Sequence, residues 1–275
     1  MTTPVYLVDA FARRPFTGNP AAVCPLAEWL PNATMQQMAA EHNLAETAFF
    51  MPLPAGSEAD FHLRWFTPTF EIDLCGHATL ASAHVLYQEL HFARPEIVFQ
   101  SQSGLLRVRR EEDGRLVLDF PSRPPRPLPE VEVPKDLTRA LGPHAAQPLA
   151  VLAARDLVVE FARAEQVLAL HPDFAALETL GYVGVIATAP GAAEGVDFIS
   201  RFFAPEVGVP EDPVTGSAHS TLIPFWAEKL GKTELFARQE SARGGELWCR
   251  LRGERVDIGG YAVTYLRGTI DVPVP

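Results

Sequence analysis

The chain has 275 residues, of which 47% are apolar and 21% are charged, a balance typical of folded globular proteins and unlike that of disordered chains. Its formal net charge of −11 disfavours nucleic acid and anionic membrane surfaces as partners, because like charges repel. Proline, glycine or a charge interrupts every apolar run before it reaches the roughly 18 to 20 residues that a membrane helix needs. We therefore expect neither nucleic acid nor a membrane as a partner.

The cysteines and histidines indicate a compartment and argue against a metal ion. Cys24, Cys75 and Cys249 are odd in number and show no CxxC spacing, which favours a reducing compartment over a disulfide framework. The N-terminal apolar run ends at Asp9 with no basic flank before it, unlike a signal peptide. None of the eight histidines belongs to an HExxH or Cys/His pattern. These features predict a cytoplasmic protein with no metal site.

The first half of the chain predicts short strands, one long helix and a hairpin, in that order. A strand-like stretch covers Asn43–Phe50, and the aromatic strand Arg64–Pro68 ends at its proline. A glycine-containing turn leads from there to an apolar helix that begins at His77. A hairpin follows over 105–120, with Asp113-Gly114 at its turn.

The same order of signals recurs about 140 residues later. Arg201–Pro205 repeats the aromatic strand that ends at proline, and Asp212–Ala218 repeats the acid, glycine and helix start of Asp73–Ala78. The segment Gln100–Gly104, which precedes the hairpin, returns as Gln239–Gly244. Three features at nearly one offset indicate an internal duplication and therefore two lobes.

A proline-rich segment separates the two predicted lobes. Pro121–Pro134 contains six prolines, a composition that disfavours both a helix and a central strand. We assign residues 1–122 to an N-terminal lobe, 123–134 to the linker and 135–261 to a C-terminal lobe. The last predicted strand, at 262–275, is a candidate to complete the N-terminal lobe.

The two long helices are apolar around most of their circumference, which predicts that each is buried within its own lobe. The helix that begins at His77 is rich in alanine, leucine and valine, and the helix that begins at Ser217 contains Pro224 as a predicted kink. The N-terminus of a buried helix presents unpaired N–H groups and the positive end of the helix dipole. Two such ends facing one cleft would bind a carboxylate.

Glu46 is the first candidate for proton transfer. It lies in the mostly apolar stretch Asn43–Phe50, where a carboxylate loses hydration and becomes suited to general acid/base catalysis. The alternative is an ordinary strand carboxylate that points into solvent. His77 follows Gly76 at a helix start, where burial and the helix dipole favour a neutral ring that hydrogen-bonds to a substrate. A purely structural role at the helix end is its alternative.

Three further polar residues and one thiol are weaker candidates. Asp212, Thr215 and Ser217 lie in a turn that leads into a helix, and ordinary roles in the turn and the helix cap account for them when each is taken alone. Cys75 stands next to a helix start, where a thiol can be acidified, although buried free cysteines are more often inert. The turn at Thr17–Pro20 is unremarkable by itself.

Taken together, five motifs in order resemble the phenazine-biosynthesis PhzF-like isomerases, and the resemblance spans the chain. The motifs are Val8–Phe11 with Phe16–Pro20, Asn43–Thr47, Phe66–Pro68, Leu74–Thr79 and Glu211–Ser217. The resemblance implies an α+β fold similar to that of diaminopimelate epimerase. In that fold two pseudo-symmetric lobes are each a barrel-like, mostly antiparallel sheet around a central helix, with the site between the lobes.

The resemblance also implies roles for individual residues. The named member of the family isomerises trans-2,3-dihydro-3-hydroxyanthranilate, with a glutamate that moves a proton from one ring carbon to another, and Glu46 matches that glutamate. His77 and Asp212 match positions that contact polar groups of the substrate. The remaining matched positions are expected to line the site or bind the substrate carboxylate: Asn19, Gly76, Thr215, Gly216 and Ser217.

The resemblance leaves three functions open. The first is an isomerase that needs no cofactor, acts on a small carboxylate and forms a homodimer. The second is an epimerase or racemase that uses Glu46 and Cys75 on opposite faces of a stereocentre. Related epimerases use one cysteine per lobe, and Thr215 stands here where the second cysteine would be, which weighs against a two-thiol mechanism. The third is a binding or scaffold protein without turnover.

Overall fold

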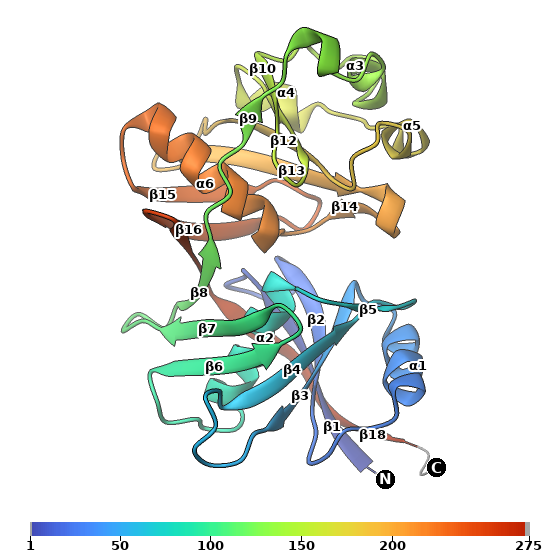
Figure 1. Ribbon diagram of the computed structural model, residues 1–275, viewed down its shortest axis with the longest axis vertical. Helices are drawn as coiled ribbons and strands as arrows, with labels where there is room; N and C mark the ends of the chain where they lie inside the picture. The colour runs from blue at the N-terminus through green and yellow to red at the C-terminus, as the bar shows by residue number, and fades with distance from the viewer. Residues whose placement is uncertain (1, 273–275) are drawn as a thin grey trace. The chain divides into compact units, whose positions relative to one another are not determined.

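The structure is a computed structural model that describes residues 2–272. It divides into two compact units, the first made of the chain up to Asp119 together with the part that begins at Gly259, and the second running from Phe120 to Ile258 (Figure 1). Both units are built mainly from strands with few helices, so the chain belongs to the α+β class, as the sequence predicts. None of the helices in the described part of the chain is long and apolar enough to cross a bilayer.

The first unit is a mixed sheet that carries two helices. Its helices are α1 (Asn32–His42) and α2 (Gly76–Gln88). Its strands are β1 (Thr2–Ala10), β2 (Asn19–Pro25), β3 (Glu46–Pro52), β4 (Phe61–Phe66), β5 (Glu71–Ile72), β6 (Glu96–Ser101), β7 (Gly104–Arg110), the greater part of β8 (Leu116–Pro121), and β18 (Ala262–Asp271). The candidate last strand therefore belongs here: β18 pairs antiparallel with β1 along its length. Residues 273–275 of that prediction lie outside the described residues.

The second unit contains a larger number of short elements. Its helices are α3 (Leu137–Ala140), α4 (Ala164–Leu168), α5 (Phe174–Glu178) and α6 (Gly216–Leu230), with 3₁₀ turns η1 (Glu130–Glu132) and η2 (Pro205–Val207). Its strands are β9 (Arg126–Pro127), β10 (Ala150–Ala153), β11 (Leu157–Glu160), β12 (Val185–Pro190), β13 (Phe198–Ala204), β14 (Val209–Asp212), β15 (Glu234–Gln239), β16 (Gly245–Arg252) and the first part of β17 (Arg255–Gly260).

The predicted duplication is present in the strand pairing. In the first unit β2 and β3 are parallel, β3 and β4 antiparallel, and β4 pairs antiparallel with β5 and parallel with β6. In the second unit β11 and β12 are parallel, β12 and β13 antiparallel, and β13 pairs antiparallel with β14 and parallel with β15. The antiparallel hairpin β6–β7 has its counterpart in β15–β16. The two units thus have matching topology.

A half-buried ion pair is duplicated together with the strands. Arg64 donates from Nε and Nη2 to the two carboxylate oxygens of Glu71, both at 2.7 Å. Arg201 makes the same two-pronged contact with Glu211, at 2.7 and 2.9 Å. Such bidentate pairs fix geometry more strongly than single contacts, so in each unit they hold the short strand that leads to the long helix.

Both long helices are buried, as their composition predicts. In α2 the residues from His77 to Tyr87 are buried, apart from half-buried His84, and the helix contacts β1, β2, β3 and β18. In α6 ten residues are buried, and the helix contacts β15 and β16. A helix enclosed on most sides fixes the position of its own first turn.

The segment predicted as a linker, 123–134, lies within the second unit and takes part in its structure. β9 pairs with β10, and the backbone N–H of Arg123 donates to the carbonyl of Ser220 at 2.9 Å. That carbonyl would normally accept from the residue four positions later, but this residue is Pro224, which has no N–H. The proline in α6 is thus accommodated because the incoming segment supplies the missing donor.

Candidate active site

Three elements of the first unit bring four polar side chains together. Asn19 is the first residue of β2 and Glu46 the first residue of β3, and because these strands are parallel neighbours, both side chains lie at the same end of the sheet. Cys75 is the N-cap residue of α2, and His77 lies in its first turn. Residues far apart in sequence thus meet where the central helix begins.

The imidazole of His77 is the centre of this cluster. Its Nε2 lies 3.1 Å from Oε2 of Glu46, and its Nδ1 lies 3.2 Å from Nδ2 of Asn19 and 3.5 Å from Sγ of Cys75. Because an amide nitrogen can only donate, Nδ1 accepts, and the ring proton of the neutral tautomer is on Nε2, which faces Glu46. A second proton on Nδ1 requires Asn19 to present its oxygen instead, so the protonation of His77 is coupled to the orientation of that amide.

The cluster is largely closed to solvent. His77 is 5% exposed and Cys75 6% exposed, whereas the side chain of Glu46 is 13% exposed. Despite their short separation, Oε2 of Glu46 and Nε2 of His77 are buried atoms without an aligned hydrogen bond. Buried polar atoms in this state are costly to folding, which is typical of atoms that are held ready for a ligand or a reaction.

Two ionisable neighbours and burial shift the pKa of His77 in opposite directions. Burial does lower the pKa of His77, but the neighbouring Cys75 sulfur, when it is charged, and the Glu46 carboxylate outweigh it and raise the pKa well above its usual value. The sequence shows the helix start but not the carboxylate that faces the ring. A protonated His77 would stabilise the ionised form of Glu46.

The thiol of Cys75 is not acidified. Burial, the largest effect, and the nearby Glu46 carboxylate raise its pKa to about 11, although His77 acts in the opposite direction. The helix start therefore does not turn Cys75 into a resting thiolate.

The second unit holds the other predicted residues at the start of α6. Thr215 is the N-cap residue of α6, followed by Gly216 and Ser217 in the first turn. The hydroxyl of Thr215 donates to Oδ2 of Asp212 at 2.5 Å. The structure thus brings these four residues together in one loop, at a place that corresponds by topology to the Cys75 loop of the first unit.

Two buried residues near this loop were not among the predicted site residues. The side chain of Gln239 accepts from the Thr215 backbone N–H at 2.8 Å and donates to the Asp212 carbonyl at 2.8 Å. His219 donates from Nδ1 to the carbonyl of Thr215 at 2.8 Å, and burial lowers its pKa to about 4. In the sequence Gln239 marks only the repeated segment before a hairpin, and nothing there shows that its amide turns toward α6.

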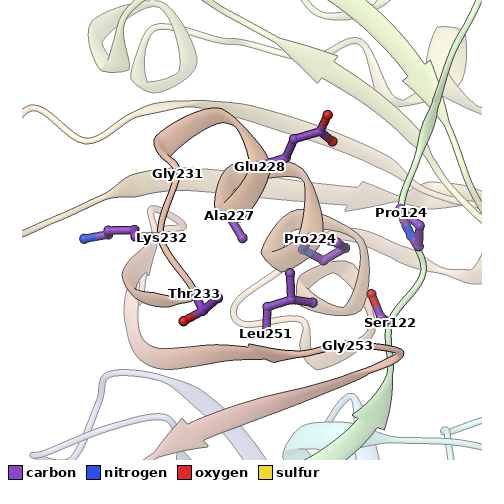
Figure 2. A pocket seen from close by; sticks show the side chains of 10 residues that line it. All are labelled: Ser122, Pro124, Pro224, Ala227, Glu228, Gly231, Lys232, Thr233, Leu251 and Gly253. Carbon is purple, nitrogen blue, oxygen red and sulfur yellow. The ribbon is translucent and has the colours of Figure 1, made fainter.

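A separate pocket in the second unit contains none of the predicted residues. It has a volume of about 370 Å³, lies around the C-terminal half of α6, and is lined by residues that include Pro224, Lys232 and Leu251 (Figure 2). The ammonium group of Lys232 is paired with Asp197 at 2.5 Å. Because its cation is already neutralised, we assign no ligand to this pocket.

Comparison with known proteins gives one consistent result. The model of the family described as phenazine biosynthesis-like protein, PhzC-PhzF, matches residues 8–268. A Pseudomonas aeruginosa protein named an uncharacterized isomerase is 53% identical over 271 residues, with 98% of this chain and 99% of that protein covered. The crystal structure of a PhzF family protein from Enterococcus faecalis superposes with a TM-score of 0.91 at 45% identity, covering 99% of this chain and 100% of the other.

More distant structures share the fold alone. A hydroxyproline epimerase from Agrobacterium vitis, solved with bound trans-4-hydroxy-L-proline, has a TM-score of 0.60 at 12% identity and covers 98% of this chain and 92% of its own. The epimerase-like fold that the sequence predicts is therefore confirmed.

Proposed function

Because the chain belongs to the phenazine biosynthesis-like PhzC-PhzF family, we propose that it is an isomerase that moves a proton within a small carboxylated substrate, with Glu46 as the acid/base. The observation that carries the proposal is the buried contact at 3.1 Å between Oε2 of Glu46 and Nε2 of His77, in which neither atom has an aligned hydrogen bond. A half-buried carboxylate with an oxygen that lacks an aligned hydrogen bond is well suited to accept a proton from carbon.

The proposed reaction needs no group other than the substrate and the side chains. Glu46 removes a proton from one carbon of the substrate, and the electron pair of the broken C–H bond enters the conjugated system of the substrate. The same carboxyl group then returns the proton to another carbon, which restores its ionised form. The raised pKa of His77 favours an imidazolium that stabilises the carboxylate before and after the transfer. The protein is proposed to work without a cofactor.

Substrate binding is proposed for the loops at the two helix starts. Backbone N–H groups at a helix N-terminus attract a carboxylate, and Gly76 and Gly216 each begin a long buried helix. We assign Ser217 and the Gly216 region to the substrate carboxylate, Asp212 and His77 to other polar groups, and Asn19 and Thr215 to supporting positions.

An epimerase is the second candidate, and one contact favours it. Sγ of Cys75 and the carboxylate of Glu46 contact opposite nitrogens of one imidazole, so the site contains two proton-carrying groups linked by His77. A protonated thiol, with a pKa of about 11, is suited to donate a proton to the face of a stereocentre that Glu46 does not reach.

The test is hydrogen–deuterium exchange of candidate substrates in D₂O, followed by NMR. The panel contains trans-2,3-dihydro-3-hydroxyanthranilate, trans-4-hydroxy-L-proline and L-proline. We expect the wild type to exchange a carbon-bound proton of at least one cyclic amino or carboxylic acid, and Glu46→Gln to abolish this exchange. Glu58→Gln is the matched control, because Glu58 is an exposed glutamate of the same unit, and it should exchange at the wild-type rate.

The outcomes separate the candidates. Full exchange by Glu46→Gln would overturn the proposal. Inversion at one carbon that is lost in Cys75→Ser would establish the epimerase. Ligand-induced thermal stabilisation without any exchange would indicate a binding protein instead.

A further inference from the structure

The cluster around His77 contains the ligand set of a transition-metal ion. The carboxylate of Glu46, the sulfur of Cys75 and a ring nitrogen of His77 all lie within 4.8 Å of one another. The three groups are an oxygen, a sulfur and a nitrogen donor, and each is a regular ligand of Zn²⁺. The sequence spacing does not reveal this set, because Glu46 lies on β3 and the other two residues lie at the start of α2.

A second observation points to a cation at the same place. Nε2 of His77 and Oε2 of Glu46 are buried and without an aligned hydrogen-bond partner, and they face each other at 3.1 Å. A cation that displaces the Nε2 proton and binds both atoms would satisfy the two at once. His77, at 5% exposure, is held in place by the buried helix that carries it.

One separation is already close to that in a tetrahedral site, and a movement of the thiol would complete it. With metal–ligand bonds of about 2.0 to 2.3 Å, the ligand atoms of a tetrahedral zinc site lie about 3.3 to 3.8 Å apart. The distance of 3.1 Å between Nε2 and Oε2 is close to this range, whereas the limit of 4.8 Å for the whole trio lies above it, so the three groups must draw closer together around the ion. Sγ of Cys75 lies nearest to the other ring nitrogen, so rotation of the thiol toward Nε2 is the movement that completes the site. Three protein ligands would leave the fourth position open.

We propose that Glu46, Cys75 and His77 bind Zn²⁺, and that the bound ion inhibits the protein. Binding replaces the thiol proton and the Nε2 proton of the imidazolium by the metal: the S–H and N–H bonds are broken, zinc–thiolate and zinc–imidazole bonds form, and two protons are released to solvent without any change of oxidation state. Inhibition follows because a carboxylate that coordinates the ion can no longer accept a proton from a substrate. The inhibition rests on the function proposed above, whereas the binding does not.

The binding is tested first, with Co²⁺ alone as the spectroscopic probe. A thiolate bound to Co²⁺ gives a sulfur-to-metal charge-transfer band in the near ultraviolet, which histidine and carboxylate ligands do not give. We expect about one equivalent of Co²⁺ to produce the band in the wild type, Zn²⁺ to abolish it by displacement, and Cys75→Ala and Cys75→Ser to lack it. Cys249→Ala is the matched control, because Cys249 is also a buried free thiol but lies in the second unit, and it should retain the band.

The roles of the other two ligands are tested by affinity. We expect His77→Gln and Glu46→Gln each to weaken Zn²⁺ binding at least about tenfold, as changes in or near a metal site typically do. His144→Gln, which alters an exposed histidine, should leave the affinity unchanged. A charge-transfer band that persists in Cys75→Ala, or equal Zn²⁺ affinity in all variants, would overturn the site.

The inhibition is tested separately, with the exchange assay and the substrate found in it. Micromolar Zn²⁺ should suppress exchange, and EDTA should restore it in full. If EDTA instead abolished exchange and Zn²⁺ restored it, the ion would be an activator and the inhibition would be wrong. If Co²⁺ binds as expected but no panel compound exchanges, the metal site stands and the proposed reaction fails.

Discussion

Protonation of His219 should make the second unit sensitive to mild acid. This ring is 0% exposed and donates from Nδ1 to the Thr215 carbonyl, and burial, opposed by that hydrogen bond, lowers its pKa from 6.5 to about 4. The folded state therefore binds fewer protons than the unfolded state between these two values. The stabilising contribution is complete above pH 6.5 and is lost as the pH falls toward 4.

The size of the effect follows from the shift. One pKa unit corresponds to about 1.36 kcal/mol, so a shift of this size is worth about 3.4 kcal/mol in total. Integration of the proton-binding difference between pH 7 and pH 5 gives a loss of about 2 kcal/mol from His219 alone. A glutamine at this position can donate the same hydrogen bond but does not titrate. We therefore expect His219→Gln to lose about 2 kcal/mol less stability than the wild type between pH 7 and pH 5.

The measurement is urea unfolding at pH 7, 6 and 5, followed by tryptophan fluorescence and extrapolated to water. Trp226 packs against Phe198, which also contacts the His219 ring, so the part of the signal that comes from Trp226 reports on the surroundings of the titrating group. His144→Gln, which alters an exposed ring, should keep the wild-type pH dependence. Equal pH dependence in His219→Gln and the wild type would refute the reasoning.

Three further predictions concern other parts of the molecule. Gln239→Leu removes the side-chain amide that accepts from the Thr215 backbone N–H and donates to the Asp212 carbonyl. It should lower the free energy of unfolding, measured by urea titration, by about 2 to 4 kcal/mol, and a loss below about 0.5 kcal/mol would contradict this expectation. Gly260→Ala places a Cβ 2.4 Å from the ring of buried Phe11 and should lower the free energy of unfolding by about 1 to 3 kcal/mol. Gly253→Ala has no neighbour within 4 Å of the new Cβ, but residue 253 has a positive φ, so this variant should lose about 1 kcal/mol. Thermal unfolding of the two variants measures which loses more stability. Because the thiol of Cys75 is buried and its pKa is raised to about 11, iodoacetamide at pH 7.5 should leave Cys75 unmodified in the folded protein and label it after denaturation. Mass spectrometry measures the labelling, and carboxamidomethylated Cys75 in the native sample would contradict the prediction.

The parts of the fold that follow from periodic patterns could be predicted from the sequence. The apolar circumference of the segment after His77 predicts a buried helix, and α2 is one. The aromatic strands that end at Pro68 and Pro205 predict equivalent positions in two lobes, and the pairing around β4 and β13 has the same order. These signals are local, and each repeats at one offset along the chain.

The contacts within the site could not be predicted in the same way. The contact between Glu46 and His77 depends on the parallel pairing of β2 and β3 and on the packing of α2 against both strands, and no local pattern encodes it. The pKa of His77 is lowered by burial and raised by Cys75 at the same helix start and by Glu46, and only the last of these neighbours arrives from another element. The segment 123–134 has the composition of a linker, but its backbone is used by the second unit, a role that depends on Pro224 far along the chain.

The pairing of β18 with β1 has a consequence for biosynthesis. Thr2 is paired with Asp271, so the first unit contains strands from both ends of the described chain. During synthesis the whole second unit leaves the ribosome before β18, residues 262–271, does. Until β18 has emerged, one edge of β1 has no strand to pair with. Chaperone binding to nascent chains should therefore concentrate on β1. A circular permutant that connects Asp271 to Thr2 would place β18 and β1 next to each other in the chain and remove this delay in their pairing.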